Sequence, residues 1–250
     1  MKIEIREQKI LSLLESRGEM SASDLSKILG ISVSTLRKQL AVMQEKKLVI
    51  RTYGGVMSVN QYADESFESK IHKAVIEKRR IANKARTLIG DDKSISLGSG
   101  TTVYALCNIL DDLEGVSIYT NSMQSAEYLA LCGSLDVHIC GGIIRAATGT
   151  IIGNEAYEFF RGLEVDSAFI SCDALDEAGN VFSDSITVAT VEREVLRSAK
   201  KCYVLCDSTK LGKKTTALIT NIAQCEGMIT GINDSEVAEK LSYVGNVIFV

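Results

Sequence analysis

The stretch from Ser94 to Thr102 has the residue types of an anion-binding loop. Its apolar residues Ile95 and Leu97 predict a short buried strand, and Gly98-Ser99-Gly100-Thr101-Thr102 follows as the turn into a helix. Glycines let the backbone approach a ligand closely, hydroxyls donate hydrogen bonds, and a helix start presents unpaired N–H groups. These residues predict a phosphate site. The alternative is a glycine-rich turn that serves only its own geometry, and two glycines alone do not predict a dinucleotide site.

Each of the next four predicted strands also ends in small or polar residues. The carboxyl ends of parallel strands meet along one edge of a sheet, so we expect these residues to gather around the first loop. Glycines and hydroxyls suit a phosphate, amides and carboxylates suit sugar hydroxyls, and Lys210 adds a positive charge. The alternative is that these strand ends are polar only because they are exposed. The predicted phosphosugar site consists of Gly98, Ser99, Gly100, Thr101, Thr102, Thr120, Asn121, Ser122, Gly141, Gly142, Asp173, Asp207 and Lys210.

Strands and helices alternate from about residue 76 onward, as expected for strands that are joined by crossover helices. The predicted strands are 95–97, 116–120, 137–140, 165–171, 202–206, 228–230 and 247–249. The predicted helices are 103–110, 124–131, 155–161, 187–199 and 236–241. This alternation predicts an α/β domain with a doubly wound, mostly parallel sheet that carries helices on both faces.

The first sixty residues have a different pattern, with three predicted helices and a hairpin. Residues 4–16 have helical apolar spacing, Ser21 and Ser32 are predicted to cap the second and third helices, and Gly30 to end the second. Residues 48–59 alternate around a Gly-Gly pair, which predicts a β-hairpin. Two short helices joined by a glycine turn predict a helix-turn-helix.

The third helix is predicted to read DNA. Its apolar residues share one face, so its hydroxyl and basic residues point away from the core. Such side chains reach base edges and phosphates when a helix lies in the major groove, and basic residues of the hairpin contact the backbone or the minor groove. The alternative is a protein-docking module with a solvated polar face. The predicted DNA contacts are Ser32, Ser34, Thr35, Arg37, Lys38, Arg51 and Tyr53.

These motifs together resemble the DeoR family of bacterial transcriptional regulators. The segment Ile31–Leu40 resembles the family's third helix, V-S-x-x-T-I-R-R-D-L, and Arg51–Val56 resembles its hairpin, R-x-H-G-G-A. The later motifs resemble its effector domain, written D-S-G-T-T, T-N-S, G-G and D-x-S-K. The resemblance covers roughly residues 3–235. The departures from the family pattern are Lys38, Gln39, Tyr53, Gly98 and Thr209.

Three of these departures lead us to expect differences in DNA binding or effector binding. Lys38 keeps the positive charge of the family's Arg but loses its bidentate geometry. Gln39 stands where the family has an acid, and we expect it to alter the preferred operator. Gly98 stands where the family commonly has Asp, and we expect the loss of a carboxylate near the sugar to change which sugar phosphate fits.

The resemblance implies a DNA-binding regulator of sugar-metabolism genes, expected to be a repressor, that responds to a phosphorylated sugar. We expect a winged helix-turn-helix domain at 1–59, a linker at 60–75 and a sugar-phosphate effector domain at 76–250. The implied partners are double-stranded operator DNA, the sugar-phosphate effector and further copies of the chain, as a dimer or tetramer.

An aldose–ketose isomerase is the alternative function, because the family's effector domain is itself similar to ribose-5-phosphate isomerase. Glu192 falls near the position of that enzyme's base. The segment Phe182–Ser185 falls near the enzyme's K-G-G-G segment but contains no lysine, so the cation that stabilises an enediolate is missing. We therefore expect a regulator rather than an enzyme.

The composition fits a basic head on an acidic body. Residues 1–60 carry ten Lys or Arg and six Asp or Glu, a net charge of +4, and the remaining residues carry 18 and 26, a net charge of −8. No apolar run approaches the roughly 20 residues of a membrane span, and the first residues lack the apolar core of a signal peptide. The odd count of seven Cys, with no C-x-x-C pair, predicts reduced thiols in the cytoplasm. We expect neither a metal nor a cofactor.

Overall fold

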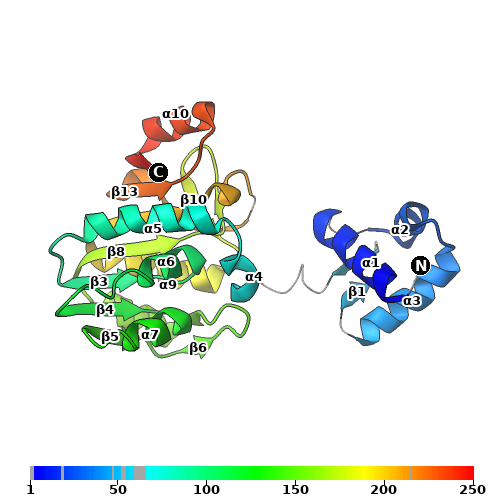
Figure 1. Ribbon diagram of the computed structural model, residues 1–250, viewed down its shortest axis with the longest axis horizontal. Helices are drawn as coiled ribbons and strands as arrows, with labels where there is room; N and C mark the ends of the chain where they lie inside the picture. Colours follow the sequence, from blue (N-terminus) through cyan, green and yellow to red (C-terminus); the bar gives the residue numbers. More distant parts are fainter. Residues whose placement is uncertain (1–2, 18–19, 47, 52–54, 59–65, 214) are drawn as a thin grey trace. The chain divides into compact units, whose positions relative to one another are not determined.

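The computed structural model describes residues 3–17, 20–46, 48–51, 55–58, 66–213 and 215–250 (Figure 1). The chain divides into two compact units, residues 1–66 and residues 67–250. Each unit has its own hydrophobic core, as expected for separate domains.

The first unit consists of three helices and a two-stranded hairpin. Its helices are α1 (Ile3–Arg17), α2 (Ala22–Leu29) and α3 (Val33–Glu45), and its antiparallel strands are β1 (Val49–Arg51) and β2 (Val56–Ser58). The helices pack their apolar faces together, as their spacing predicts. The buried core consists of Ile10, Leu14, Leu25, Leu36, Leu40, Met43, Val49 and Val56. The predicted helix-turn-helix with a following hairpin is confirmed.

Local hydrogen bonds fix the turn between α2 and α3. The Ser21 hydroxyl accepts a hydrogen bond from the Asp24 backbone N–H at 3.1 Å, and the Ser32 hydroxyl accepts one from the Thr35 N–H at 3.2 Å. Gly30 ends α2 with a φ of +65°, a left-handed conformation that glycine adopts without strain. Because an N-cap contributes about 1 kcal/mol, these residues define where α3 begins.

The hairpin is held against the segment before α2. Met20 and Val56 exchange two backbone hydrogen bonds, of 3.0 and 2.9 Å. A Cβ atom at Gly55 would lie 2.3 Å from the Met20 carbonyl oxygen, so glycine is required at this close approach. The other glycine of the predicted turn, at position 54, lies outside the described residues.

The second unit is built on a seven-stranded sheet in which all neighbouring strands are parallel (Figure 1). The strand order is β14-β13-β11-β8-β3-β4-β5. The chain passes from β3 outward through β4 to β5, then places β8 on the other side of β3 and continues through β11 to β14. This is the predicted doubly wound arrangement. The strands are β3 (Ser94–Leu97), β4 (Val116–Thr120), β5 (Leu135–Ile139), β8 (Val165–Ser171), β11 (Ala199–Cys206), β13 (Gly227–Thr230) and β14 (Val247–Phe249).

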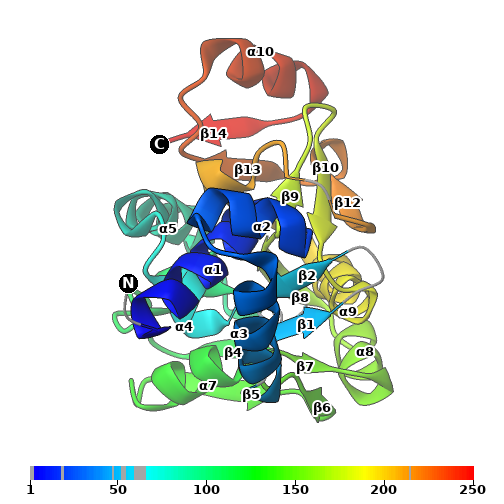
Figure 2. The ribbon, with the colours of Figure 1, turned by 90° about the vertical axis from the view of Figure 1, so that its right-hand side faces the viewer.

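Helices cover both faces of this sheet, as Figure 2 shows for α5 and α7 on one side and α8 and α9 on the other. Alternate residues of a strand face the two cores, so Phe169 of β8 packs into one and Ile170 into the other. Fully burying one such side chain contributes about 1.5–3 kcal/mol. The helices are α5 (Val75–Ile89), α6 (Thr101–Cys107), α7 (Met123–Ala130), α8 (Asn154–Arg161), α9 (Ile186–Arg197) and α10 (Ser235–Val244).

The sequence does not predict several short strands of the second unit. A small antiparallel sheet has the order β12-β10-β9, and β6 and β7 form a hairpin. These strands have two to five residues, too few for a period to be read from the sequence. Their bounds are β6 (Ile143–Ile144), β7 (Ile151–Ile152), β9 (Ala174–Leu175), β10 (Asn180–Ser183) and β12 (Ala217–Asn221).

A further helix, α4 (Phe67–Ile71), lies in the segment 60–75 that the sequence predicts as a linker. Residues 60–65 lie outside the described residues. The Phe67 ring packs edge-on against Tyr104 with ring centroids 5.2 Å apart, and the Phe67 N–H donates to the Ala147 carbonyl at 2.9 Å. From Phe67 onward the chain therefore belongs to the second unit, because an aromatic side chain anchors it there.

Within the described residues, no helix has both the length and the apolar character needed to cross a membrane. The same residues contain no cluster of three or more His, Cys, Asp or Glu that could hold a metal ion. All seven cysteines are free thiols.

Candidate functional site

A pocket lies at the carboxyl ends of β3 and β8, where the connections of the sheet diverge. From β3 the chain crosses to β4 and from β8 it crosses to β11, in opposite directions, which leaves a crevice between the two loops. Ser99–Thr101 after β3 and Ser171–Asp173 at the end of β8 line this pocket. Charged side chains also reach it from other elements, namely Lys70, Arg145, Asp184 and Glu192.

Gly100 allows the two loops to approach each other. Its φ is +101°, and a Cβ atom there would lie 2.2 Å from the Ser171 hydroxyl oxygen. The Ser171 hydroxyl donates a hydrogen bond to the Ser99 carbonyl at 2.9 Å. The glycine that the sequence assigns to ligand approach therefore also brings the β3 and β8 loops together.

Lys78 connects the β3 loop to α4 through two hydrogen bonds. This lysine of α5 is only 4% exposed, and its Nζ donates to Thr101 Oγ1 at 2.9 Å and to the Lys70 carbonyl at 2.7 Å. A buried ammonium is costly unless polar groups surround it. Lys78 therefore fixes the positions of Thr101 and Lys70 relative to each other.

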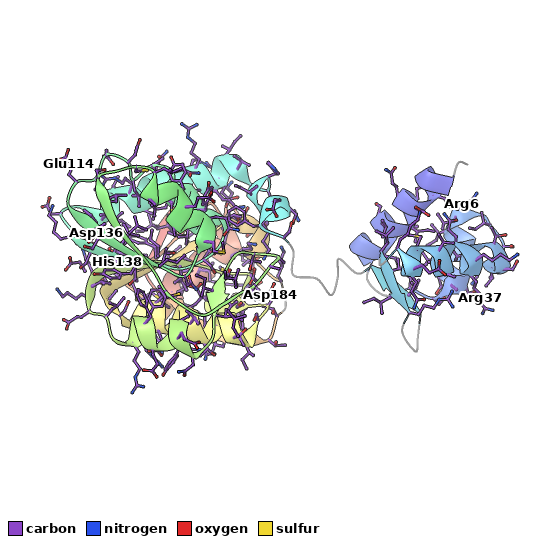
Figure 3. The ribbon with its side chains drawn as sticks, turned by 90° about the horizontal axis from the view of Figure 1, so that it is seen from below. Arg6, Arg37, Glu114, Asp136, His138 and Asp184 are labelled. Atoms are coloured by element: carbon purple, nitrogen blue, oxygen red, sulfur yellow. The ribbon has the colours of Figure 1, made fainter. Side chains whose placement is uncertain are left out.

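Lys70 and Arg145 bring positive charge to the pocket. Lys70 Nζ lies 2.8 Å from Asp173 Oδ1 and 4.0 Å from Asp184 Oδ2, and Arg145 Nη1 lies 4.0 Å from Asp184 Oδ1 (Figure 3 labels Asp184). Burial acts to raise the pKa of Asp173, but the charge and hydrogen bond of Lys70 and the Asp184 N–H outweigh it, so the pKa is lowered. Both cations are of the kind that binds phosphate.

Glu192 reaches the pocket from α9. Its Oε1 accepts hydrogen bonds from the backbone N–H and the hydroxyl of Ser99, both at 2.9 Å, and from Asn121 Nδ2 at 3.4 Å. Its Oε2 is buried and has no hydrogen-bond partner among the described residues. Burial raises the pKa of this carboxyl to about 7, although the Ser99 donors act against the rise.

The structure brings together some of the predicted effector residues and separates others. Those that line the pocket are Ser99, Gly100, Thr101 and Asp173. The pocket forms where the connections diverge, whereas the ends of β4, β5 and β11 lie further along the edge of the sheet. The predicted residues outside the lining, whose role as effector contacts stays a prediction, are Gly98, Thr102, Thr120, Asn121, Ser122, Gly141, Gly142, Asp207 and Lys210.

Several of these residues serve their own loops. Thr120 Oγ1 accepts a hydrogen bond from the Ser122 N–H at 3.1 Å, and Ser122 in turn caps α7. Asp207 accepts one from the Thr209 N–H at 3.1 Å. Gly142 has a φ of +137°, and a Cβ atom there would lie 2.4 Å from a carbonyl oxygen of the opposite strand. Their polarity and small size thus have a local structural reason.

The sequence reasoning missed the basic residues that line the pocket. Lys70 lies in the predicted linker, and Arg145 lies in a segment with no predicted element. Lys210, the predicted cation, lies in a short 3-10 turn, and its charge contributes to lowering the pKa of Asp173. The sequence does predict that the chain turns helical from about Phe67, and this aromatic residue within a polar stretch is the signal that the helix packs against a core.

The start of α3 carries a cluster of hydroxyl groups. Ser32 Oγ lies 3.0 Å from Ser34 Oγ and 2.8 Å from Thr35 Oγ1, and all three residues are exposed. Arg37 and Lys38 follow on the same helix and are also exposed, and Figure 3 shows Arg37 projecting from the first unit. These five predicted DNA contacts therefore lie on one accessible helix, with the hydroxyls at its start.

Arg51 connects the hairpin to α3. Its Nη2 donates a hydrogen bond to the Arg37 carbonyl at 3.0 Å, which leaves other guanidinium N–H groups to contact a phosphate. Arg51 is exposed at the end of β1. Tyr53, the remaining predicted DNA contact, lies outside the described residues.

Gln39 faces the interior of the first unit. It is 8% exposed, and its Oε1 accepts a hydrogen bond from Arg6 Nη1 of α1 at 3.4 Å (Figure 3 labels Arg6). The Gln39 side chain therefore contacts α1, and the expectation that Gln39 alters the preferred operator stays a prediction. Gln39 thus contributes to the packing between α3 and α1.

Comparison with known proteins identifies both units. Residues 6–62 match the family model described as the DeoR-like helix-turn-helix domain, and residues 73–231 match the DeoR C terminal sensor domain. The chain is 30% identical over 244 residues to the lactose phosphotransferase system repressor of Staphylococcus epidermidis, covering 96% of each protein. It is 27% identical over 231 residues to the glycerol-3-phosphate regulon repressor of Haemophilus influenzae, covering 92% of this chain and 90% of that protein. Among solved structures, ribose 5-phosphate isomerase A of Methanocaldococcus jannaschii matches 55% of this chain and 54% of its own, with a TM-score of 0.40 and 22% identity.

Proposed function

The chain belongs to the DeoR family of transcriptional regulators, and from this premise we propose that it is a repressor of sugar-metabolism genes whose second unit senses a phosphorylated sugar. Its family and its named relatives are those of a DNA-binding regulator rather than an enzyme. The comparisons therefore favour a regulator over the isomerase alternative.

Operator binding is assigned to α3 and the hairpin. Hydroxyls of Ser32, Ser34 and Thr35 and the basic side chains of Arg37 and Lys38 are exposed on α3. Phosphate contacts from basic residues supply affinity, and side chains at the start of a recognition helix supply sequence readout. A symmetric operator with two half-sites would engage two copies of the chain, so we include a homo-oligomer, acting in the cytoplasm, in the proposal.

Effector binding is assigned to the pocket between the β3 and β8 loops, and this pocket is the observation that carries the proposal. Lys70 and Arg145 supply positive charge for a phosphate, and Ser99, Thr101 and Asp173 supply hydrogen-bonding groups for hydroxyls. The relatives named for a lactose phosphotransferase system and a glycerol-3-phosphate regulon support control by a phosphorylated carbohydrate.

The position of Lys70 suggests how the pocket communicates with the rest of the chain. Lys70 lies on α4, the first helix of the second unit, and it pairs with Asp173 across the pocket at 2.8 Å. A phosphate that binds Lys70 takes the place of the Asp173 carboxylate and changes the forces on α4. Because the effector then favours one arrangement of α4, it changes the affinity of the regulator for its operator.

Calorimetric titration of the full chain tests this assignment. The probes are ribose 5-phosphate, glucose 6-phosphate, fructose 6-phosphate and glycerol 3-phosphate, and we expect at least one to bind and to change operator affinity measured by fluorescence anisotropy. Lys70→Ala should weaken that binding at least about tenfold, because a hydrogen bond to a charged group contributes about 1.5–3 kcal/mol.

Lys93→Ala provides the matched control, since Lys93 is exposed and precedes β3 at the opposite end of that strand from the pocket. The assignment is wrong if none of the probes binds, or if Lys70→Ala and Lys93→Ala bind the same probe equally well.

A further inference from the structure

Glu192 occupies the space that a side chain at position 98 would need. A Cβ atom built on Gly98 would lie 2.1 Å from Glu192 Oε2 and 2.9 Å from its carboxyl carbon. Glu192 cannot swing aside freely, because Ser99 holds its Oε1 with two hydrogen bonds of 2.9 Å. The absence of a side chain at position 98 is therefore what admits the Glu192 carboxylate to the β3 loop.

This contact bears on the expectation that Gly98 changes which sugar phosphate fits, which stays a prediction. Gly98 suggests that the loop has lost a carboxylate, but the structure places the carboxylate of Glu192 against that position. This carboxylate comes from α9, and the sequence pointed to Glu192 only through the resemblance to an isomerase, not through its contact with position 98.

The two carboxyl oxygens of Glu192 differ in their hydrogen bonds. Oε1 accepts hydrogen bonds from Ser99 and Asn121, whereas Oε2 has no partner among the described residues although it is buried. Glu192 is 2% exposed and lines the pocket. A buried acceptor without a donor is unfavourable when the carboxyl is ionised, so a ligand hydroxyl that reaches Oε2 gains the hydrogen bond that the protein leaves unmade.

The charges of the pocket set the orientation of such a ligand. Above about pH 7, where the Glu192 carboxyl is ionised, it repels a phosphate, whereas Lys70 and Arg145 attract one. The hydroxyl-bearing part of the molecule is therefore directed toward Glu192, and the phosphate toward the two cations.

We propose that Glu192 determines the specificity of the sensor pocket, with its Oε2 accepting a hydrogen bond from a hydroxyl of the sugar while Lys70 and Arg145 hold the phosphate. The ligand class is a polyhydroxylated phosphosugar, and a phosphate without a hydroxyl at the right distance binds poorly. This inference rests on the function proposed above, because it names the group that selects among phosphorylated compounds.

The first test couples one ligand hydroxyl to Glu192 in a thermodynamic cycle. The four probes named above are titrated into the full wild-type chain, and the tightest is compared with its singly deoxygenated analogues. Removing the hydroxyl that faces Glu192 should weaken wild-type binding at least about tenfold. In Glu192→Gln the same deletion should have less than a third of that effect, because the charged acceptor is gone.

Glu194→Gln is the matched control. Glu194 lies on the same helix, is also buried, and pairs with Arg197 rather than lining the pocket. It should keep the full wild-type penalty for loss of the hydroxyl. Inorganic phosphate, which has no sugar hydroxyl, should bind Glu192→Gln at least as well as it binds wild type, since a repelling charge is removed.

The second test moves the carboxylate from position 192 to position 98. Gly98→Asp alone should lose binding of the selected probe at least about tenfold, because its Cβ meets Glu192. Adding Glu192→Ala to Gly98→Asp should recover binding relative to Gly98→Asp alone, since the space is vacated and a carboxylate remains.

The outcomes separate this inference from the proposed function. If no probe binds the wild-type chain, both are overturned. If a probe binds but every deoxygenated analogue loses the same affinity in wild type and in Glu192→Gln, the pocket stands as the effector site and the role of Glu192 is wrong. If Gly98→Asp binds the selected probe as tightly as wild type does, the position of Glu192 against Gly98 is not needed for binding, and this part of the inference is wrong.

Discussion

Gln39 shows how a residue in a DNA-reading helix can belong to the core instead. Its neighbour Lys38 is exposed, whereas Gln39 is 8% exposed and accepts a hydrogen bond from Arg6. One helical residue corresponds to a rotation of about 100°, so adjacent residues face different surroundings. A departure from a family motif must therefore be interpreted by the direction of the side chain.

We expect Gln39→Ala to lower the free energy of unfolding of the first unit by about 1 kcal/mol, because the hydrogen bond from Arg6 is lost and a buried volume is left unfilled. Urea unfolding of the full chain, followed by far-ultraviolet circular dichroism, measures this change. Lys38→Ala should leave stability within about 0.5 kcal/mol and weaken operator binding instead. An unchanged Gln39→Ala stability would contradict the assigned packing role.

Glu192 makes the stability of the second unit depend on pH. Its pKa is raised from 4.5 to about 7, so between these values the folded protein binds more protons than the unfolded chain. The free energy of unfolding therefore falls as pH rises from about 4.5 to about 7, by up to about 3 kcal/mol in all. Asp173 adds to this rise in pKa, and the Cys140 thiol also interacts with Glu192.

Glu192→Gln should abolish this contribution, so the variant gains stability relative to wild type between pH 5 and pH 8. Urea unfolding of both proteins at the two pH values gives the difference directly. Glu194→Gln serves again as the control and should follow the wild-type pH dependence. Parallel curves for wild type and Glu192→Gln would show that the buried carboxyl does not titrate in this range.

At the scale of elements, α3 depends on its cap for its starting point. The Ser32 hydroxyl accepts the Thr35 N–H and also contacts the hydroxyls of Ser34 and Thr35. The same side chain is a predicted DNA contact, so its structural and binding roles overlap. Two substitutions with opposite properties separate these roles.

Ser32→Ala should lower the stability of the first unit by about 1 kcal/mol, because the N-cap is lost. Ser32→Asp should preserve stability, since Asp is an effective cap, but should weaken operator binding by placing a negative charge near phosphates. Thermal unfolding and fluorescence anisotropy of the full chain measure the two effects. Equal operator affinity in wild type and Ser32→Asp would place Ser32 away from the DNA.

The elements were predictable where apolar residues recur with a regular period. Leu36, Leu40 and Met43 indicate the buried face of α3, and Ile95 and Leu97 indicate a buried strand. The short strands β6, β7 and β9 have two residues each, and no period can be read from them. They are set by their contacts in the folded unit rather than by local sequence.

The pocket was predictable only in part, because its residues converge through topology. The β3 loop and Asp173 follow strands, so the rule for parallel sheets places them at one edge. Lys70, Arg145 and Glu192 come from a helix, a hairpin loop and another helix. Their meeting depends on the strand order, which the alternation of helices and strands does not specify.

At the scale of the whole molecule, the two parts of the chain carry net charges of opposite sign. The net charge is +4 over residues 1–60 and −8 over the remainder. Operator affinity should therefore decrease with salt through contacts of the first unit alone. The proposed effector site uses side chains of the second unit, so substitutions in the two units should have separable effects.

Arg37→Ala should weaken operator binding and reduce the slope of log affinity against log salt concentration by about one, if Arg37 contacts a phosphate. Anisotropy titrations between 50 and 200 mM salt, roughly the range over which such effects are large, measure the slope. Lys70→Ala should leave the slope unchanged. An identical slope for wild type and Arg37→Ala would remove Arg37 from the phosphate contacts.

At the proposed effector site, the ion pair between Lys70 and Asp173 would also set the concentration range in which the regulator responds. Its two charges are 2.8 Å apart, so an anion that binds Lys70 must displace an internal one. The midpoint of the dose response is therefore higher than the bare attraction of the cations would give. A sensor built in this way would be insensitive to traces of phosphorylated compounds and would respond when their pool in the cell becomes large.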